Sequence, residues 1–151
     1  MIHVERVMTV PVPLDEVVAY LSDFAHAVDW DPGTVECTRA DGEEGRPVET
    51  GAHWHNVSEF RGRKTELTYR LDRFDPDRLV FEGRNKTAST TDDLSFSPAE
   101  DGGTTRVSYH ATINFKGVAS LASPFLRREF EKLGDEITRT LPDALVRHAR
   151  G

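Results

Sequence analysis

The sequence predicts an α+β domain in which one long C-terminal helix lies across an antiparallel sheet. Between residues 107 and 115 every second side chain is apolar, so one face of this strand has to be covered. From Leu126 to Leu145 the apolar residues recur at steps of three and four, which places an apolar stripe along a helix. A half-apolar strand that leads into such a helix indicates that the helix covers the sheet. If the sheet is curved, a cavity is expected between the two.

The first part of the chain predicts one strand and two short helices. The strand spans residues 2–10, where apolar and polar side chains alternate until Pro11 and Pro13 prevent further pairing. A short helix is expected at residues 14–21, with acidic residues in its first turn, and a second at residues 24–30.

The rest of the chain predicts six strands and the long helix, which makes a single domain over residues 1–151. The separators are short and rich in turn residues, so the strands form consecutive antiparallel hairpins. We expect the helix to begin with Ser123 as N-cap and Pro124 in the first turn, and Pro142 to bend or end it. The six predicted strands are residues 35–39, 51–60, 64–74, 78–84, 88–96 and 104–115.

Composition excludes several classes of function. A formal net charge of −7 over 151 residues disfavours nucleic-acid binding, which needs a concentrated basic surface. No apolar run is long enough to span a membrane and the N-terminus enters a strand directly, so we expect a cytoplasmic protein without stable membrane insertion. The single cysteine, Cys37, allows no internal disulfide. No nucleotide loop, nucleophile elbow or paired-cysteine motif is present, so no cofactor is expected.

Six short segments, taken in this order, resemble the START-like (SRPBCC) superfamily and in particular its polyketide cyclase/dehydrase and lipid-transport branch. The resemblance covers nearly the whole chain, and it rests on the order and spacing of the segments. They are VPVPLDEV (10–17), VDWDPG (28–33), GAHW (51–54), LDRFDPDRLVF (71–81), TDDLSF (91–96) and GTTRVSY (103–109).

This resemblance implies a helix-grip fold. In that fold a strongly curved, seven-stranded antiparallel sheet wraps the C-terminal helix, two small helices close one end, and a ligand cavity lies between sheet and helix. The resemblance also places Trp30 and Phe24 at the cavity mouth. The functions of the superfamily range from aromatic polyketide cyclisation to carriage of lipids, quinones or hormones and to co-chaperone roles, so the fold alone does not select one.

Asp92 is the candidate catalytic residue. Leu94 and Phe96 mark the inward face of their strand, and alternation puts Asp92 and Thr90 on the same face. Burial would raise the pKa of Asp92 and suit it to general acid or base catalysis. The alternative is a structural role, in which Asp92 accepts a hydrogen bond from a neighbouring strand.

Other inward side chains form a candidate ligand-binding set. Aromatic and apolar neighbours place polar groups such as Asn56 and Ser58 on the inner face, and the same pattern also fits an ordinary core. The full set is Trp30, Trp54, Asn56, Ser58, Tyr69, Phe81, Thr90, Asp92, Leu94, Tyr109, Ile113 and Phe130.

A metal site is not predicted. His53 and His55 share the outward face of their strand with Glu59, but no third ligand stands at a convincing spacing, so an exposed polar face is the preferred interpretation. His26 near the cavity entrance could serve as an acid or base, but a solvated helix position is the preferred interpretation. Cys37 has no histidine partner in a recognisable motif, so it is not predicted to be a nucleophile.

Three functions therefore remain open. The first is binding of a hydrophobic or aromatic small molecule that is polyketide-, lipid- or quinone-like. The second is a cyclase, aromatase or dehydratase with Asp92 as acid/base, the rings of Trp54, Tyr69 and Tyr109 around the substrate, and a carbonyl polarised by Asn56 or Ser58. The third is a protein-interaction module with an incidental cavity. Because only one inward carboxylate and no inward histidine are evident, binding is preferred.

Overall fold

The computed structural model describes residues 1–40, 42, 44–60, 62–116 and 124–151. The first strand, β1 (Ile2–Val10), is followed by three short helical elements: α1 (Leu14–Ser22), the 3-10 turn η1 (Phe24–His26) and α2 (Ala27–Trp30). Then come β2 (Thr34–Arg39), β3 (His53–Phe60), β4 (Arg63–Asp75), β5 (Arg78–Arg84), β6 (Ala88–Pro98), β7 (Thr105–Phe115) and finally α3 (Pro124–Arg150).

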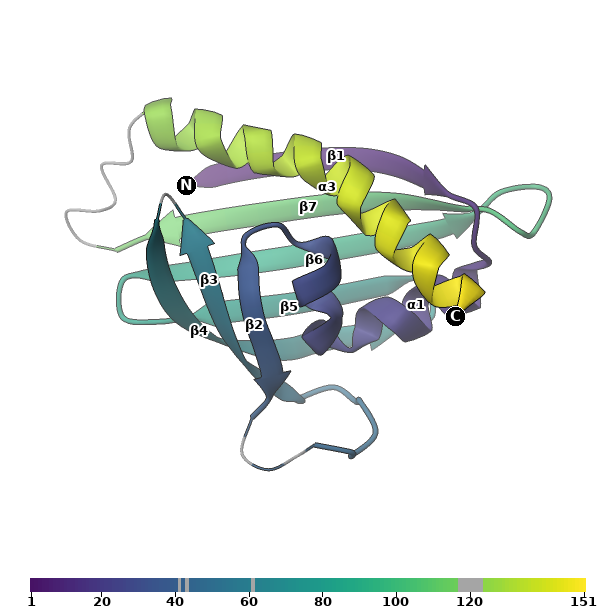
Figure 1. Cartoon of the computed structure of the whole chain (residues 1–151), viewed down its shortest axis with the longest axis horizontal. Coiled ribbons are helices and arrows are strands. Elements are labelled where there is room, and N and C mark those ends of the chain that lie inside the picture. Colours follow the sequence, from purple (N-terminus) through teal and green to yellow (C-terminus); the bar gives the residue numbers. More distant parts are fainter. Residues whose placement is uncertain (41, 43, 61, 117–123) are drawn as a thin grey trace.

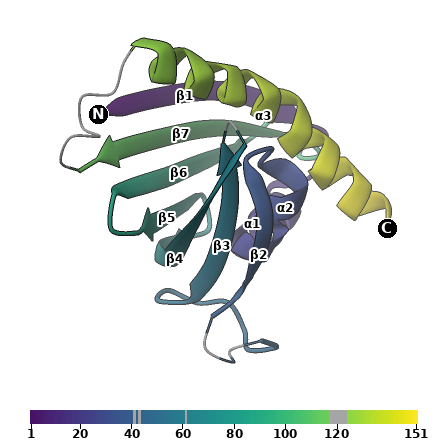
Figure 2. The ribbon, with the colours of Figure 1, turned by 60° about the vertical axis from the view of Figure 1, so that its left-hand side comes forward.

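The strands form one seven-stranded sheet in the order β1-β7-β6-β5-β4-β3-β2, with every neighbouring pair antiparallel. Helix α3 lies across this sheet, beside β1 and above the concave side (Figures 1 and 2). The predicted α+β class, the seven strands and the helix-grip arrangement are therefore confirmed.

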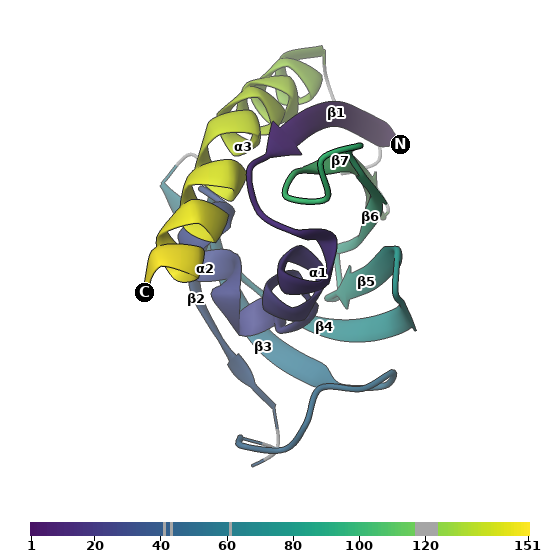
Figure 3. The same cartoon turned by 90° about the vertical axis from the view of Figure 1, so that its right-hand side faces the viewer.

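The sheet is strongly curved. Figure 3 shows the strands following one another around an arc, with α1 and α2 inside it and α3 spanning the opening. Register shifts occur between Thr34 and Glu36 on β2 and between Leu71 and Arg73 on β4. Such bulges bend a strand and increase its twist, so they account for part of the curvature that leaves space under α3.

Close packing and hydrogen bonds fix α3 against the sheet. At Gly134 a Cβ atom would lie 2.5 Å from Cγ1 of Val4, so only glycine permits this approach of helix to strand. The Arg6 guanidinium on β1 binds Glu131 Oε2 at 2.9 Å and Asp135 Oδ1 at 2.9 Å. Further along the helix, the hydroxyl of Thr140 donates to the carbonyl oxygen of Trp30 at 2.6 Å.

Three details of the helices bear on the sequence-based expectation. Helix α3 continues through Pro142 to Arg150, so the proline does not end it, and the helix axis changes direction along its length in Figure 1. The segment predicted as one helix over residues 24–30 is a 3-10 turn followed by a single α-helical turn. The predicted N-cap, Ser123, lies outside the described residues.

The core divides into two clusters. The larger lies between the short helices, the C-terminal half of α3 and the middle of the sheet, and Phe24 is at its centre, with ring centroids 4.3 Å from Tyr69 and 4.6 Å from Phe81. The smaller cluster joins Ile2, Val4 and Ile113 to the N-terminal half of α3. In the described parts of the chain, no helix is both long and apolar enough to cross a membrane.

Candidate functional site

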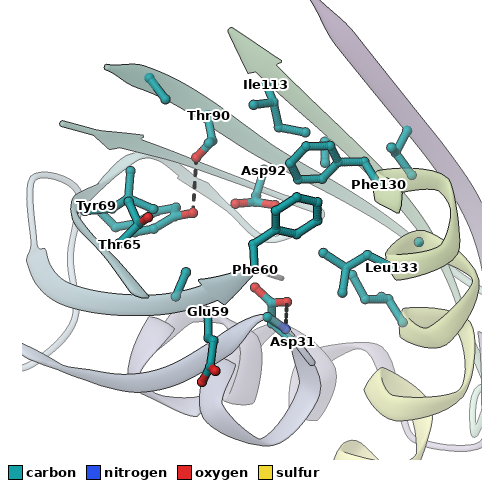
Figure 4. Close-up of a pocket in the computed structure, with 18 of the residues that line it drawn as sticks. Asp31, Glu59, Phe60, Thr65, Tyr69, Thr90, Asp92, Ile113, Phe130 and Leu133 are labelled. Atoms are coloured by element: carbon teal, nitrogen blue, oxygen red, sulfur yellow. Dashed lines mark hydrogen bonds between the residues drawn. The ribbon is translucent and has the colours of Figure 1, made fainter. Parts of the chain in front are cut away.

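A cavity of about 230 Å³ lies between the concave face of the sheet and α3. Its walls come from β1, β3, β4, β6, β7, the middle of α3, the turn between α2 and β2 and the turn between β5 and β6 (Figure 4). Both core clusters contribute side chains to it, so the cavity occupies the space between them. The apolar part of the lining consists of Val4, Phe60, Leu67, Ala88, Ala111, Ile113, Phe115, Phe130, Leu133 and Ile137.

A pair of stacked phenylalanines joins the sheet to the helix beside this cavity. The rings of Phe60 at the end of β3 and Phe130 on α3 are nearly parallel, with centroids 5.0 Å apart. Both side chains are half-buried and line the cavity. A flat apolar ligand entering between sheet and helix would therefore meet aromatic surfaces.

Asp92 is the main polar group of the cavity. It lies on β6, is 8% exposed, and directs its carboxyl group into the cavity (Figure 4). Its Oδ1 accepts a hydrogen bond of 2.7 Å from the phenol of Tyr109, whereas Oδ2 has no hydrogen-bond partner among the described residues. Burial raises the pKa of Asp92 to about 7, the Tyr109 bond opposes that rise, and the charge of Asp31 adds to it.

A second carboxyl group, Asp31, enters the cavity from the turn between α2 and β2. Its Oδ1 accepts from the backbone N–H of Gly33 at 2.9 Å and its Oδ2 from the hydroxyl of Thr34 at 3.0 Å. Burial raises the pKa of Asp31, and these two hydrogen bonds lower it. Asp31 is absent from the predicted site because an acid beside proline and glycine is typical of a helix-ending turn.

Asn56 and Ser58 belong to a hydrogen-bonded chain that ends at Asp31. Ser58 donates to the amide oxygen of Asn56 at 2.6 Å, and the Asn56 amide nitrogen donates to the hydroxyl oxygen of Thr34 at 3.2 Å. That hydroxyl in turn donates to Asp31. Ser58 lines the cavity, but its proton is committed to Asn56, and Asn56 itself stands outside the cavity lining, so neither side chain is placed to polarise a ligand carbonyl.

Tyr69 supplies a hydroxyl at the other side of the cavity. Thr90 donates to the Tyr69 phenol oxygen at 3.1 Å, which leaves the phenol proton available to a ligand. Burial, with a smaller contribution from the charge of Asp92, raises the pKa of Tyr69 well above its usual range, so the phenol stays protonated. Its ring lies over Gly83, where a Cβ atom would be 2.6 Å from the Tyr69 ring.

The predicted ligand-binding residues fall into two groups. Those that line the cavity are Ser58, Tyr69, Thr90, Asp92, Tyr109, Ile113 and Phe130. Those that are buried but stand outside its lining are Trp30, Trp54, Asn56, Phe81 and Leu94. Alternation correctly put the strand residues of this second group on the inner face, but Phe24 and the short helices, which include Trp30, fill that part of the concave side.

The expectation that Trp30 and Phe24 stand at the cavity mouth is wrong. Each is 1% exposed, and the two rings pack edge to face in the larger core cluster. Trp54 is likewise held there, by a 2.9 Å hydrogen bond from its indole N–H to Asp23. The cavity residues that the sequence-based set lacked are chiefly Asp31, Phe60 and Leu133, which come from a turn, a strand end and the helix.

The histidines take part in surface contacts. Nε2 of His55 lies 3.2 Å from Glu66 on the neighbouring strand, and Nδ1 of His26 lies 2.6 Å from the carbonyl oxygen of Tyr20. Among the described residues, no group of three or more histidine, cysteine or acidic side chains is placed to hold a metal ion.

Solved structures share this fold over almost the whole chain. A START superfamily protein from Mycobacterium smegmatis matches with a TM-score of 0.78 and 11% identity, over 97% of this chain and 98% of that one. TTHA0849 from Thermus thermophilus matches with a TM-score of 0.78 and 13% identity, over 97% and 99% of the two chains. The Zhui aromatase/cyclase from Streptomyces sp. R1128 matches with a TM-score of 0.71 and 19% identity, over 98% and 93%.

These identities are low, so the structural matches establish the fold, and no curated protein matches the sequence. The family model described as polyketide cyclase / dehydrase and lipid transport matches residues 1–147. With the curved sheet, the gripping helix and the cavity between them, this match shows that the chain belongs to the polyketide cyclase/dehydrase and lipid-transport family.

Proposed function

We propose that this protein binds a small hydrophobic or aromatic molecule, polyketide-, lipid- or quinone-like, in the cavity between the sheet and α3. The observation that carries the proposal is a cavity with mostly apolar walls that also contains two polar groups able to orient a ligand. These are Oδ2 of Asp92, which has no hydrogen-bond partner among the described residues, and the phenol of Tyr69, whose proton is available. Ligand sites typically combine apolar walls with a few polar groups that orient the ligand. A core filled with side chains would instead favour the protein-interaction module.

The cavity volume limits the size of the ligand. An apolar cavity of about 150 Å³ holds one benzene molecule, so the volume of about 230 Å³ here suits two fused rings. The half-buried pair Phe60 and Phe130 offers flat surfaces on which such rings can stack. The family description and the aromatase/cyclase among the structural neighbours support a ligand of this kind.

The test is native mass spectrometry and calorimetric titration with naphthols, naphthoquinones and medium-chain fatty acids. We expect one bound molecule per chain, and replacing Ala111 with Phe in the cavity wall should abolish binding by filling the space. Asn114→Phe is the matched control, because Asn114 is exposed on the same strand. The proposal fails if none of these compounds binds, or if Ala111→Phe binds as well as the control.

Acid–base catalysis at Asp92 is the second candidate function. The pKa of about 7 supports it, because a carboxyl group that titrates near neutral pH can both take and return a proton. In an aldol-type cyclisation, the Asp92 carboxylate would remove a proton from the carbon next to a carbonyl. The C–H electron pair would move into the enolate, whose oxygen would accept the Tyr69 proton as a hydrogen bond.

Asp92→Asn separates the two functions. If Asp92 is catalytic, the variant should retain a ligand such as naphthol but lose turnover of a polyketide-like substrate by a factor of about 100 or more. Asp93→Asn is the control, because Asp93 is the next residue on β6 and pairs with Arg78 at 2.7 Å outside the cavity. Unchanged turnover in Asp92→Asn would exclude catalysis by this carboxyl group.

A further inference from the structure

The charged groups of the cavity are all of one sign. Among the described residues that line it, the charged side chains are Asp31, Glu59 and Asp92, and all three are acidic. The carboxyl group of Glu59 points away from the cavity, whereas Asp31 and Asp92 point into it (Figure 4). Asp31 and Asp92 therefore line one cavity, and the charge of Asp31 adds to the burial that raises the pKa of Asp92.

Several hydroxyl groups of the cavity lining already donate within the protein, whereas the Tyr69 phenol proton stays available. The Tyr109 hydroxyl is committed to Asp92, the Thr90 hydroxyl to Tyr69 and the Ser58 hydroxyl to Asn56. Oδ2 of Asp92 remains without a partner among the described residues, although Asp92 is more than nine-tenths buried. Because this oxygen is accessible from the cavity, a ligand that brings a donor can form a charge-assisted hydrogen bond with the Asp92 carboxylate.

We infer that the polar end of the ligand is a protonated amine that binds Asp92. This inference rests on the proposed binding function and specifies its ligand: an aromatic skeleton of about two rings that carries a basic nitrogen. An ammonium group donates to Oδ2 of Asp92 and is attracted by the charge of Asp31 as well. A carboxylate ligand would face two acids with no cation in the described lining to compensate it.

This ligand class has a distinct pH dependence. Because the pKa of Asp92 is raised to about 7 in the free protein, much of this residue is protonated at neutral pH. An ammonium ion favours the carboxylate form, so its binding expels the Asp92 proton. The amine should therefore bind more tightly as the pH rises from about 6 to 8, up to about tenfold per pH unit below the pKa. An alkyl amine stays protonated over this range.

Three ligands with one skeleton test the inference: naphthylethylamine, naphthylethanol and naphthylacetate, each titrated calorimetrically at several pH values. At about pH 8 we expect the amine to bind about tenfold or more tightly than the alcohol, and the acetate to bind weakest. Amine binding near neutral pH should release a proton from Asp92. The release is measured as a change of the calorimetric binding enthalpy between buffers of different ionisation enthalpy. An alcohol or acetate that binds as tightly as the amine would overturn the inference.

Substitutions in the cavity test which residue causes the preference for the amine over the alcohol. Asp92→Asn should reduce the advantage of the amine over the alcohol to less than about threefold, and Asp31→Asn should reduce it partially. Asp93→Asn keeps the full preference because its side chain lies outside the cavity. A preference that survives in a folded Asp92→Asn protein would overturn the assignment.

The two proposals fail in different ways. Binding of naphthylethanol or naphthylacetate without any preference for the amine rejects only the inferred amine. If none of the three compounds binds, the inferred amine is rejected, and the proposed function is rejected with it only if the naphthols, naphthoquinones and fatty acids also fail to bind.

Discussion

The phenol of Tyr109 donates a 2.7 Å hydrogen bond to Oδ1 of Asp92, and the two residues lie on the neighbouring strands β7 and β6. In the register of this pair Asp92 stands opposite Ala111 and Tyr109 opposite Leu94, so the bond runs diagonally on the inner face. It stabilises the charged form of a carboxyl group that burial otherwise disfavours. The Tyr109 bond is therefore one of the interactions that keep Asp92 able to titrate near neutral pH.

Replacing Tyr109 with Phe should raise the pKa of Asp92 above 7, because burial remains while the hydrogen bond is lost. A titration of the Asp92 side-chain carbon by nuclear magnetic resonance measures this directly, and a rise of about one pH unit is expected. Tyr69→Phe is the control, since the Tyr69 hydroxyl is bonded to Thr90 instead. An unchanged or lower pKa in Tyr109→Phe would contradict this account.

Asp92→Asn should flatten the pH dependence of stability. The pKa of Asp92 is about 7 when folded and 3.8 as a free side chain, so between these values the folded state holds a proton that the unfolded state has released. The free energy of unfolding of the wild type therefore falls as the pH rises through this window, by about 4 kcal/mol at most from this group. Urea unfolding at pH values from about 4 to 8 measures the difference between the two proteins. Equal slopes for both would rule out the raised pKa.

Gly134→Ala should destabilise the protein by about 1 to 3 kcal/mol through forced overpacking. The new methyl group would lie 2.5 Å from Cγ1 of Val4, so α3 has to move away from β1 even though alanine favours helices. Gly103→Ala is the matched control, because a Cβ atom there meets nothing within 4 Å. Thermal unfolding of both variants checks the prediction, which fails if Gly134→Ala is as stable as the control.

Gly83→Ala should weaken ligand binding without touching the ligand. Its methyl group would lie 2.6 Å from the ring of Tyr69 and 2.9 Å from Oγ1 of Thr90, so the ring has to shift toward the cavity. We expect the affinity for naphthylethanol to fall about tenfold, a loss of about 1.4 kcal/mol. Gly103→Ala again serves as control, and calorimetry compares the two. Equal affinities would show that the position of Tyr69 does not limit binding.

The inner face of the sheet could be predicted from residue alternation alone. Asp92, Thr90 and Tyr109 face inward because Leu94 and Val107 on the same strands must be buried. The same rule placed Trp54 and Phe81 on this face correctly, but it could not distinguish cavity from core. That distinction depends on Phe24, whose ring fills one end of the concave side.

Contacts between segments that are far apart in the sequence could not be predicted from local sequence patterns. Asp31 stands in a turn, and its local sequence predicts only the end of a helix. The packing of α2 against α3 brings Asp31 to the same cavity as Asp92. Similarly, Phe60 and Phe130 stack because α3 passes the end of β3, and no spacing between them signals this.

The sequence by itself determined the element order, the α+β class and the side of each strand that faces inward, because these follow from local periodicity and turn chemistry. The tertiary structure alone decided where the concave side stays open, which acids share the cavity and how Tyr109 tunes Asp92. The physical reason is that burial, hydrogen bonding and charge coupling depend on distances between segments that are far apart in the chain, and these distances are set only when α3 packs against the curved sheet.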